Sequence, residues 1–427
     1  MTELYIPHLT TAITGPLRHL EKHIIEYQII IEKWFRKAWE QTPAPIYSSV
    51  DLRNAGFKLA PIDTNLFAAG FNNLNQDFMP LCIQAAKNTL EKRFPHCEKI
   101  LLIPENHTSN IGYFENLAVI QNILIKAGYD TQIGSLLPEL SQAKQIELPS
   151  GRKITLHPII REQNYLKLAS FEPCIILLNN DLSEGTPDIF NEIKQPIIPP
   201  VELGWRNRLK SQHFTHYDTI IAEFSELINI DPWLINPLFR QCGDIDFMTR
   251  EGETCLTDNI ELLLKNIQRK YQQYGITETP FVIVKADAGT YGMGVMTVRT
   301  PEDILSLNRK QRNKMSATKG KQNVSHVIIQ EGVPSFETVG EEQAIAEPVI
   351  YLIGSHVVGG FYRVHRDKSS YESLNAPGSH FEALAFADCC ANPSLRGHET
   401  PNRFYAYGVV ARLAALAAAK EKQEVVK

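Results

Sequence analysis

Hydrophobic residues recur at three- and four-residue steps between residue 14 and about residue 40. The pattern follows Thr14-Gly15-Pro16, which is a typical helix start, and charged residues occupy the positions between. It predicts one long amphipathic helix. Such a helix either belongs to the core of the chain or packs against a second copy, and the second alternative predicts a homodimer.

Two short apolar runs further along the chain each lead into a polar loop. Residues 100–104 (ILLIP) precede the loop 105–110 and a helical pattern over 114–127, and residues 174–178 (CIILL) precede another polar loop. Strands that open into polar loops indicate an open, mostly parallel α/β sheet with a binding edge at the strand C-termini. Prolines at 196, 199 and 200 mark a boundary. We therefore expect an N-terminal α/β domain over 1–200 and a mostly helical connecting region over 201–275.

From residue 276 the chain changes to paired strands with glycine turns. Strands are predicted over 281–285, 295–298 and 324–330, with a hairpin around Gly354-Ser355 and an alanine-rich helix over 404–420. The basic stretch 309–321 is predicted to be a solvent-exposed loop. Residues 276–427 are thus predicted to form a C-terminal domain with an antiparallel sheet.

Composition narrows the classes of function. The chain has 427 residues and a net charge of −5, so it lacks the basic excess of a nucleic-acid-binding protein. Its apolar stretches are shorter than the roughly 18–20 residues that span a bilayer, and residues 1–10 do not resemble a secretory signal. We expect a cytoplasmic protein without a membrane partner.

The seven cysteines show no CxxC spacing. This argues against a zinc site and against a disulfide framework. Cys174 lies in an apolar run and is interpreted as a small core residue.

The most informative segment is residues 281–298, FVIVKADAGTYGMGVMTV. An apolar strand ends in Lys285, a loop carries Gly289, Gly292 and Gly294, and an apolar strand returns. Glycines let backbone N–H groups approach phosphate oxygens, and a lysine adds a point charge. A hairpin whose glycines serve only tight turns is the alternative.

Other phosphate-binding loops do not fit this order. A Walker loop places its lysine after the glycines, and a Rossmann fingerprint opens a helix. A protein kinase places its lysine on the strand after the loop and needs HRD and DFG motifs, which are absent. A lysine strand followed by a glycine loop is the ATP-grasp order.

Later segments extend this pattern. Residues 327–334 (VIIQEGVP) form an apolar strand that runs into an acidic bend suited to adenine, with Glu331 or Glu337 available for the ribose. Arg363 on a following strand can hold a transferring phosphoryl group, and Asn375 offers a neutral oxygen to Mg²⁺.

The chain resembles ATP-grasp carboxylate–amine ligases such as glutathione synthetase, and more closely the proteobacterial glutamate–cysteine ligase family. The matching stretches include residues 49–74, 101–110, 204–214 (GWRNRLKSQHF), 282–295, 328–334 and 346–378. The resemblance implies an ATP-grasp-like α/β fold and ligation of L-glutamate to L-cysteine with ATP and Mg²⁺, the first step of glutathione synthesis. The sequence departs from the ATP-grasp pattern in one respect. Typical members end the site with an E-x-N motif on a late strand, and no E-x-N follows Asn375 here.

The expected site residues fall into four groups. Arg363 and Lys285 are the expected catalytic residues. The expected ATP-binding residues are Lys285, Gly289, Thr290, Tyr291, Gly292, Met293, Gly294, Gln330, Glu331, Gly332 and Val333. The expected metal ligands are Asn375, Glu372 and Glu347, with Glu382 and Asp388 as further candidates. The expected substrate-binding residues are Asp51, Arg53, Lys58, Asp63, Asn65, Asn73, His107 and Asn110.

The substrate residues follow from the chemistry of glutamate, which presents an ammonium and two carboxylates. Arg53 and Lys58 could bind the carboxylates, and Asp51 or Asp63 the ammonium. Asx turns around Asn65 and a helix cap at Asn110 are the alternatives. For the whole chain, the alternatives to a glutamate–cysteine ligase are glutathione synthetase, another amino-acid ligase, and a nucleotide-binding module without catalysis.

Overall fold

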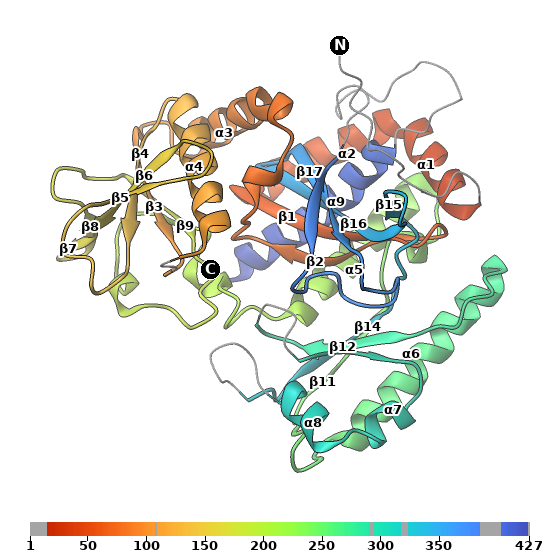
Figure 1. The fold of residues 1–427 in the computed structure, drawn as a ribbon. Coiled ribbons are helices and arrows are strands. Elements are labelled where there is room, and N and C mark those ends of the chain that lie inside the picture. The colour runs from red at the N-terminus through yellow and green to blue at the C-terminus, as the bar shows by residue number, and fades with distance from the viewer. Residues whose placement is uncertain (1–14, 107–108, 290–293, 317–322, 385–402, 426–427) are drawn as a thin grey trace.

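The computed structural model describes residues 15–106, 109–289, 294–316, 323–384 and 403–425. Three main sheets organise these residues, and Figure 1 shows them as a left-hand lobe, a central layer and a lower lobe. No helix in the described segments is long and apolar enough to cross a membrane.

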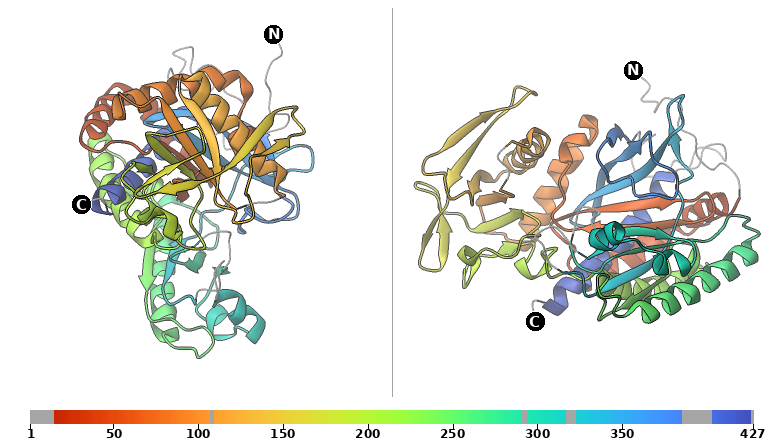
Figure 2. Two further views of the ribbon diagram at one scale, coloured as in Figure 1. Left: turned by 90° about the vertical axis from the view of Figure 1, so that its left-hand side faces the viewer. Right: turned by 60° about the horizontal axis from the view of Figure 1, so that its bottom comes forward.

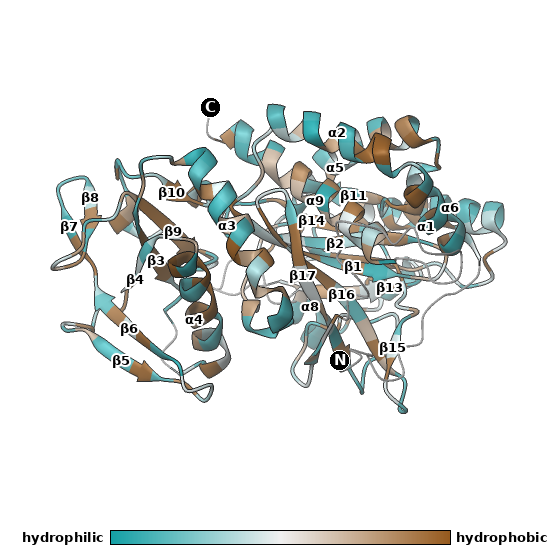
Figure 3. Ribbon diagram, turned by 90° about the horizontal axis from the view of Figure 1, so that it is seen from above, coloured by the Kyte–Doolittle hydropathy of each residue, from teal (hydrophilic) through white to brown (hydrophobic). Residues whose placement is uncertain are grey.

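The left-hand lobe holds a mostly parallel sheet with the strand order β10-β9-β3-β4-β6-β5. Its strands are β3 (Lys99–Pro104), β4 (Asp130–Ser135), β5 (Lys144–Glu147), β6 (Lys153–Pro158), β9 (Ile175–Asn179) and β10 (Ile197–Ile198). β3 and β9 are buried on both faces, which explains their uninterrupted apolar runs. Figure 3 shows both strands in brown between their neighbours. The open parallel sheet predicted from these two runs is confirmed.

The central sheet is antiparallel and joins distant parts of the chain. Its order is β18-β17-β16-β1-β2, with β15 paired to β16. The strands are β1 (Tyr47–Asn54), β2 (Leu59–Asn65), β15 (Thr338–Val339), β16 (Ala344–Ile353), β17 (His356–His365) and β18 (His380–Ala383). The predicted hairpin is confirmed, because Ile353 pairs with His356 across Gly354-Ser355. The predicted domain limits at 200 and 275 stay a prediction. In this sheet β1 pairs with β16 of the C-terminal part on one side and with β2 on the other.

The lower lobe holds the third sheet, with the antiparallel order β11-β14-β12-β13. Its strands are β11 (Phe239–Cys242), β12 (Val282–Ala286), β13 (Val295–Val298) and β14 (Val327–Glu331). The helices α6 (Glu253–Tyr274), α7 (Glu302–Leu305) and α8 (Arg309–Met315) accompany it. The predicted loop over 309–321 is therefore wrong for its first seven residues, where Asn308 and Gln311 form a capping box.

The predicted helix over residues 14–40 is divided into α1 (Pro16–Glu26) and α2 (Gln28–Gln41). Their apolar residues join a core with α5 (Lys210–Ile228), α9 (Arg403–Val425) and one face of the central sheet. α9 is buried around most of its circumference, which its alanines permit because they leave little volume to accommodate. The face expected to contact a second copy is thus covered by the chain itself, although Ile29 and Ile30 remain 72% and 43% exposed.

The opposite face of the central sheet packs on α3 (Met79–Arg93) and α4 (Ile111–Lys126). These helices, orange in Figure 2, also contact the parallel sheet, so the left-hand lobe and the central layer share one core. Together the three sheets form an α/β fold with an open, mostly parallel sheet in the N-terminal part and antiparallel sheets formed largely by the C-terminal part, which confirms the predicted α/β class.

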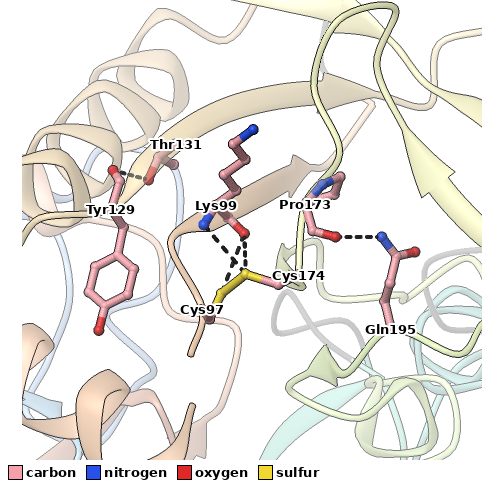
Figure 4. The surroundings of a disulfide bond; sticks show 7 residues. All are labelled: Cys97, Lys99, Tyr129, Thr131, Pro173, Cys174 and Gln195. Carbon is pink, nitrogen blue, oxygen red and sulfur yellow. Dashed lines mark hydrogen bonds between the residues drawn. A yellow bond between two sulfur atoms is a disulfide. The ribbon is translucent and has the colours of Figure 1, made fainter. Parts of the chain in front are cut away.

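A disulfide joins Cys97 to Cys174, contrary to the prediction (Figure 4). The two cysteines precede β3 and β9, which are neighbouring parallel strands, so the strand pairing brings them together. Cys174 is exposed rather than part of the core. The prediction failed because 77 residues separate the two cysteines in sequence.

Candidate active site

A cavity of about 370 Å³ lies where the three sheets meet. The central sheet contributes residues of β1, β2, β16 and β17, and the lower lobe contributes β12 and β14. The left-hand lobe contributes Glu105 and Asp181, which follow β3 and β9. The binding edge predicted for the parallel sheet therefore faces the cavity.

Arg363 lies at the centre of a charged cluster in this cavity. Its Nη1 donates to Asp51 Oδ2 at 2.8 Å and to Glu347 Oε1 at 2.5 Å. Glu347 and Arg363 are direct cross-strand partners on β16 and β17, so the sheet register places them together. Burial alone would lower the pKa of Arg363, but the two carboxylates outweigh it and raise the pKa.

Arg53 extends this cluster. Its Nε donates to Glu347 Oε2 at 3.0 Å, and its other donors reach the carbonyl oxygens of Val333 and Ser370. Arg53 shares a strand face with Asp51, two residues earlier on β1. Burial raises the pKa of Asp51 because Arg363 offsets only part of this cost, while Glu347 and Asp63 add further negative charge.

Lys285 lies at the end of β12, opposite Ile328 and Val295. Its ammonium donates to the Ile62 carbonyl oxygen at 3.0 Å and to Gln330 Oε1 at 2.8 Å. Burial lowers the pKa of Lys285, and nearby aspartates offset this only in part. Gln330 is 2% exposed, and its Nε2 has no hydrogen-bond partner among the described residues. This buried donor in the cavity wall suits an acceptor atom on a ligand such as ATP.

The expected ATP-binding residues only partly line the cavity. Gly289, Gln330, Glu331 and Val333 do so, whereas Gly294 and Gly332 are not among the lining residues. Thr290, Tyr291, Gly292 and Met293 lie outside the described residues. Gly289 and Gly294 have φ values of 95° and 64°, which glycine adopts readily. The loop therefore needs glycine at both of its described ends.

Glu331 has partners of its own. Its carboxylate accepts from Lys58 at 2.6 Å and from the Trp233 indole at 3.0 Å. Glu337 is buried and accepts from the Tyr407 hydroxyl at 2.6 Å, and it does not line the cavity. Glu331 therefore lines the cavity with its carboxylate already hydrogen-bonded to the protein, whereas Glu337 lies away from the cavity.

Among the expected substrate residues, Asp51, Arg53, Asp63, Asn65 and Asn73 line the cavity. Lys58 does not, because its ammonium is fully buried against Glu331 and lies over the Trp233 ring.

The two alternatives kept open for asparagines are both visible. Asn65 Oδ1 accepts from the Phe67 N–H, as in an Asx turn, and Asn110 Oδ1 accepts from the Tyr113 N–H as the cap of α4. Asn110 does not line the cavity, and His107 lies outside the described residues.

The expected metal ligands Glu347, Glu372 and Asn375 all line the cavity but do not form a ready metal site. Glu347 is held by two arginines, and Glu372 accepts from Lys368 and Ser369. Glu382 pairs with His380 on β18, and Asp388 lies outside the described residues. No group of three His, Cys, Asp or Glu residues in the described part of the chain could hold a metal ion. The donors that the structure describes therefore do not fit a site formed by the protein alone.

Sequence reasoning missed several lining residues. Trp205 and Lys210 belong to a stretch that carried the family resemblance, but no role followed from the residue types. Glu105 and Asp181 follow strands whose ends were expected to bind ligands. Their position after a buried strand was the signal that could have identified them.

Comparisons with known proteins identify the family of the chain. A model of the glutamate-cysteine ligase family, GshA, matches residues 21–422. A solved structure of a "putative gamma-glutamylcysteine synthetase" from Methylobacillus flagellatus KT is 55% identical, with a TM-score of 0.92, and the match covers 99% of this chain and 100% of that one. A search of curated proteins finds no match.

Two further solved structures are much less similar. A glutathione synthetase-like effector from Globodera pallida has 9% identity, 87% coverage of each chain and a TM-score of 0.40. A D-alanyl-alanine synthetase A from Vibrio cholerae has 12% identity, with 74% of this chain and 81% of that one covered, and a TM-score of 0.35. We draw no argument from these two. The family match and the first structure suffice: the chain belongs to the glutamate-cysteine ligase family.

Proposed function

We propose that this chain joins the γ-carboxylate of L-glutamate to the amine of L-cysteine through an acyl phosphate, with ATP as the energy source. Family membership implies ATP and the two amino acids. The observation that supports the proposal most strongly is the cavity itself. It brings Lys285 and Arg363 together with a surplus of carboxylates, including those of four strands, β1, β2, β14 and β16.

The chemistry explains why such a cavity is needed. A γ-carboxylate oxygen of glutamate attacks the γ-phosphorus of ATP, the bond to the β-phosphate oxygen breaks, and ADP leaves. The cysteine amine then attacks the acyl carbon and loses a proton, and inorganic phosphate leaves. Both steps build negative charge on oxygens, so fixed cations and correct positioning provide most of the catalysis.

The charged residues divide naturally between these tasks. Lys285, on the glycine-loop strand, is proposed to bind ATP phosphates, and Arg363 to stabilise the transferring phosphoryl group. Asp51 and Asp63 are proposed to bind a substrate ammonium. Burial raises the pKa of Asp51, Arg363 offsets this only in part, and Glu347 and Asp63 add negative charge, so a further cation would stabilise the Asp51 carboxylate. Arg53 is the proposed partner of a substrate carboxylate, and its contact with Glu347 must then be exchanged or shared.

Mg²⁺ remains a proposal based on the family alone. The described carboxylates form no cage, so we propose that the ion arrives with the phosphates of ATP and that the protein adds few ligands, as is usual for this ion. Asn375, Glu372 and Glu347 are its candidate ligands. No step above depends on them.

We also propose a cytoplasmic location, because ATP and free glutamate are available there, and a homodimer. The observation that supports the dimer is the exposure of Ile29 and Ile30 on α2. Sedimentation that finds a monomer at micromolar concentration would remove it.

The test of the proposed reaction is phosphate release from ATP with L-glutamate, with L-cysteine added or withheld, and mass spectrometry of the product. Cysteine-dependent release with a glutamyl-cysteine mass would support the proposal. Activity only with γ-glutamylcysteine and glycine would replace the substrates with those of glutathione synthetase. Absence of turnover with every amino-acid pair would favour a nucleotide-binding module without catalysis.

A further inference from the structure

Two cysteines of the lower lobe lie in direct contact without a disulfide between them. Cys242 ends β11 and is 3% exposed, whereas Cys255 lies in the first turn of α6 and is exposed to solvent. Their Sγ atoms are 3.0 Å apart. Neither residue lines the cavity, so the reaction proposed above gives this pair of thiols no role.

Regular structure holds both cysteines in place. α6 packs on β11, and Leu256 and Ile260 of α6 belong to the same core cluster as Cys242. β11 in turn pairs with β14, where Cys242 lies opposite Val327. The contact between the sulfurs therefore does not depend on a loop. A shift of about 1 Å would bring them to the length of a disulfide bond, which is about 2.05 Å.

The side chain of Asn259 contacts both sulfurs. Its Nδ2 donates to Cys242 Sγ at 3.2 Å and to Cys255 Sγ at 3.4 Å. Its Oδ1 accepts from the Arg240 guanidinium, so the amide nitrogen rather than the oxygen faces the thiols. An N–H donor stabilises a thiolate, which is the form of cysteine that attacks a disulfide. The surroundings of the pair thus favour a reactive sulfur.

The two cysteines differ in a way that sets the order of reaction. Burial and the contact with Cys255 raise the pKa of Cys242 to about 12, although Asn259 and Arg240 oppose them. Cys242 therefore stays a thiol at neutral pH, with its proton available to a neighbouring sulfur. Cys255 is the member of the pair that a small molecule can reach from solvent.

We propose that Cys242 and Cys255 form a thiol–disulfide exchange site that small disulfides of the cystine class oxidise. In the first step the Cys255 thiolate attacks one sulfur of the small disulfide. A bond forms between Cys255 and that half, and the bond within the small disulfide breaks. The other half leaves as a thiolate and takes up the proton that Cys255 had released to water.

In the second step Cys242 Sγ attacks Cys255 Sγ. The bond between Cys242 and Cys255 forms, the mixed disulfide breaks, and the departing half takes the proton of Cys242. The protein is oxidised by two electrons, and the small disulfide is reduced to two thiols.

This site goes beyond the proposed ligation, because it lies outside the cavity and needs no ATP. Cystine is the disulfide of cysteine, so the oxidant belongs to the same chemical class as a proposed substrate. The cross-link would join α6 to β11, which pairs with the strand that carries Gln330 of the cavity.

The test is peptide mapping after oxidation of the folded protein. Wild-type protein is reduced with dithiothreitol, freed of the reductant and incubated with cystine at neutral pH. The remaining thiols are alkylated in denaturant, and the chain is digested with trypsin without reduction. Cleavage after arginine and lysine places the two cysteines on separate peptides, 241–250 and 251–265. We expect mass spectrometry to find these two peptides joined by a disulfide.

Two variants separate the two steps. Cys242→Ser should keep the first step and lose the second, so that peptide 251–265 retains half of a cystine as a mixed disulfide. Cys255→Ser should lose both steps and leave Cys242 reduced, because Cys242 is buried. If Cys242→Ser does not fold, Cys242→Ala replaces it. Cys82 is the internal control, since it is 1% exposed and should stay reduced in every sample.

Three results would overturn the inference. The first is a wild-type protein in which Cys255 stays reduced. The second is a wild-type protein that retains the mixed disulfide as Cys242→Ser does, because Cys242 would then not complete the exchange. The third is oxidation of Cys82 to the same extent, which would show that cystine reacts with unfolded chains. None of these results bears on the proposed ligation, which is tested by turnover without cystine.

Discussion

Arg363 and Arg412 are two arginines with the same exposure, 11% of the side chain, in different parts of the molecule. Arg412, on α9, donates to both oxygens of Glu32 on α2, at 2.7 and 2.8 Å, and lies 4.2 Å from the Phe35 ring. Arg363 donates to Asp51 and Glu347 across a cavity. One ion pair is packed between helices, whereas the other faces a space large enough for a ligand.

The carboxylates paired with the two arginines have pKa values shifted in opposite directions, although their distances to the arginines are similar. Burial alone would raise the pKa of Glu32, but Arg412, Tyr405 and Arg36 outweigh it and lower the pKa. The pKa of Asp51 is raised, although its arginine is equally close. At Glu32 the favourable partners outweigh the effect of burial, whereas at Asp51 burial, with the added negative charge of Glu347 and Asp63, outweighs Arg363. An unbalanced buried charge cluster is a better sign of a binding site than an ion pair as such.

The largest expected effect is that of Arg363→Met on turnover. We expect phosphate release to fall about 10³-fold, because the substitution removes the cation proposed to stabilise the transferring phosphoryl group. Stability should change less, since water in the cavity can hydrate Asp51. Turnover within a few-fold of wild type would remove Arg363 from the site.

Lys285→Met should reduce turnover about 10²-fold, since Lys285 is proposed to contact the bound nucleotide rather than only the transferred group. The Michaelis constant for ATP should rise as well, which separates its role from that of Arg363. Steady-state kinetics with ATP varied would measure both. An unchanged Michaelis constant and rate would contradict the proposed phosphate contact.

Arg412→Met should leave turnover per folded molecule unchanged and lower the free energy of unfolding by about 1 kcal/mol, because Glu32 is 40% exposed and the pair is partly screened. Urea unfolding measures this difference. A loss of turnover comparable to that of Arg363→Met would erase the contrast between the two arginines.

The smallest effects concern pH. Asp51, with its raised pKa, costs stability when ionised, so Asp51→Asn should stabilise the protein at pH 8, and this gain should shrink as the pH falls through the pKa of Asp51. Glu32, with its lowered pKa, contributes stability above about pH 4.5 that is lost as the pH falls. Glu32→Gln should therefore lower the free energy of unfolding most at neutral pH. Thermal unfolding of both variants across this range would show opposite trends, and parallel trends would contradict the contrast.

Much of the fold could be predicted because its signals are local. The pair Gly354-Ser355 predicted the hairpin, and the apolar runs of β3 and β9 predicted the parallel sheet. The pairing of β1 with β16 was missed, because strands so far apart in sequence leave no local trace. The disulfide was missed for the same reason.

The candidate site divides in the same way. Lys285, Gly289 and Arg363 lie in motifs whose order along the chain carries meaning, and all three line the cavity. Lys58 was expected there because its loop is rich in charged residues, but its ammonium is buried against Glu331. Residue type alone could not show which way a lysine in that loop would point, nor that Lys210 would reach the cavity from a helix.

The most direct test of the account is cysteine-dependent phosphate release, measured side by side for Arg363→Met and Arg412→Met at equal concentrations of folded protein. The account predicts that Arg363→Met loses about three orders of magnitude, whereas Arg412→Met stays within about twofold of the wild type. Equal losses in the two variants, or near-normal turnover in Arg363→Met, would contradict the claim that the charge cluster in the cavity carries the reaction.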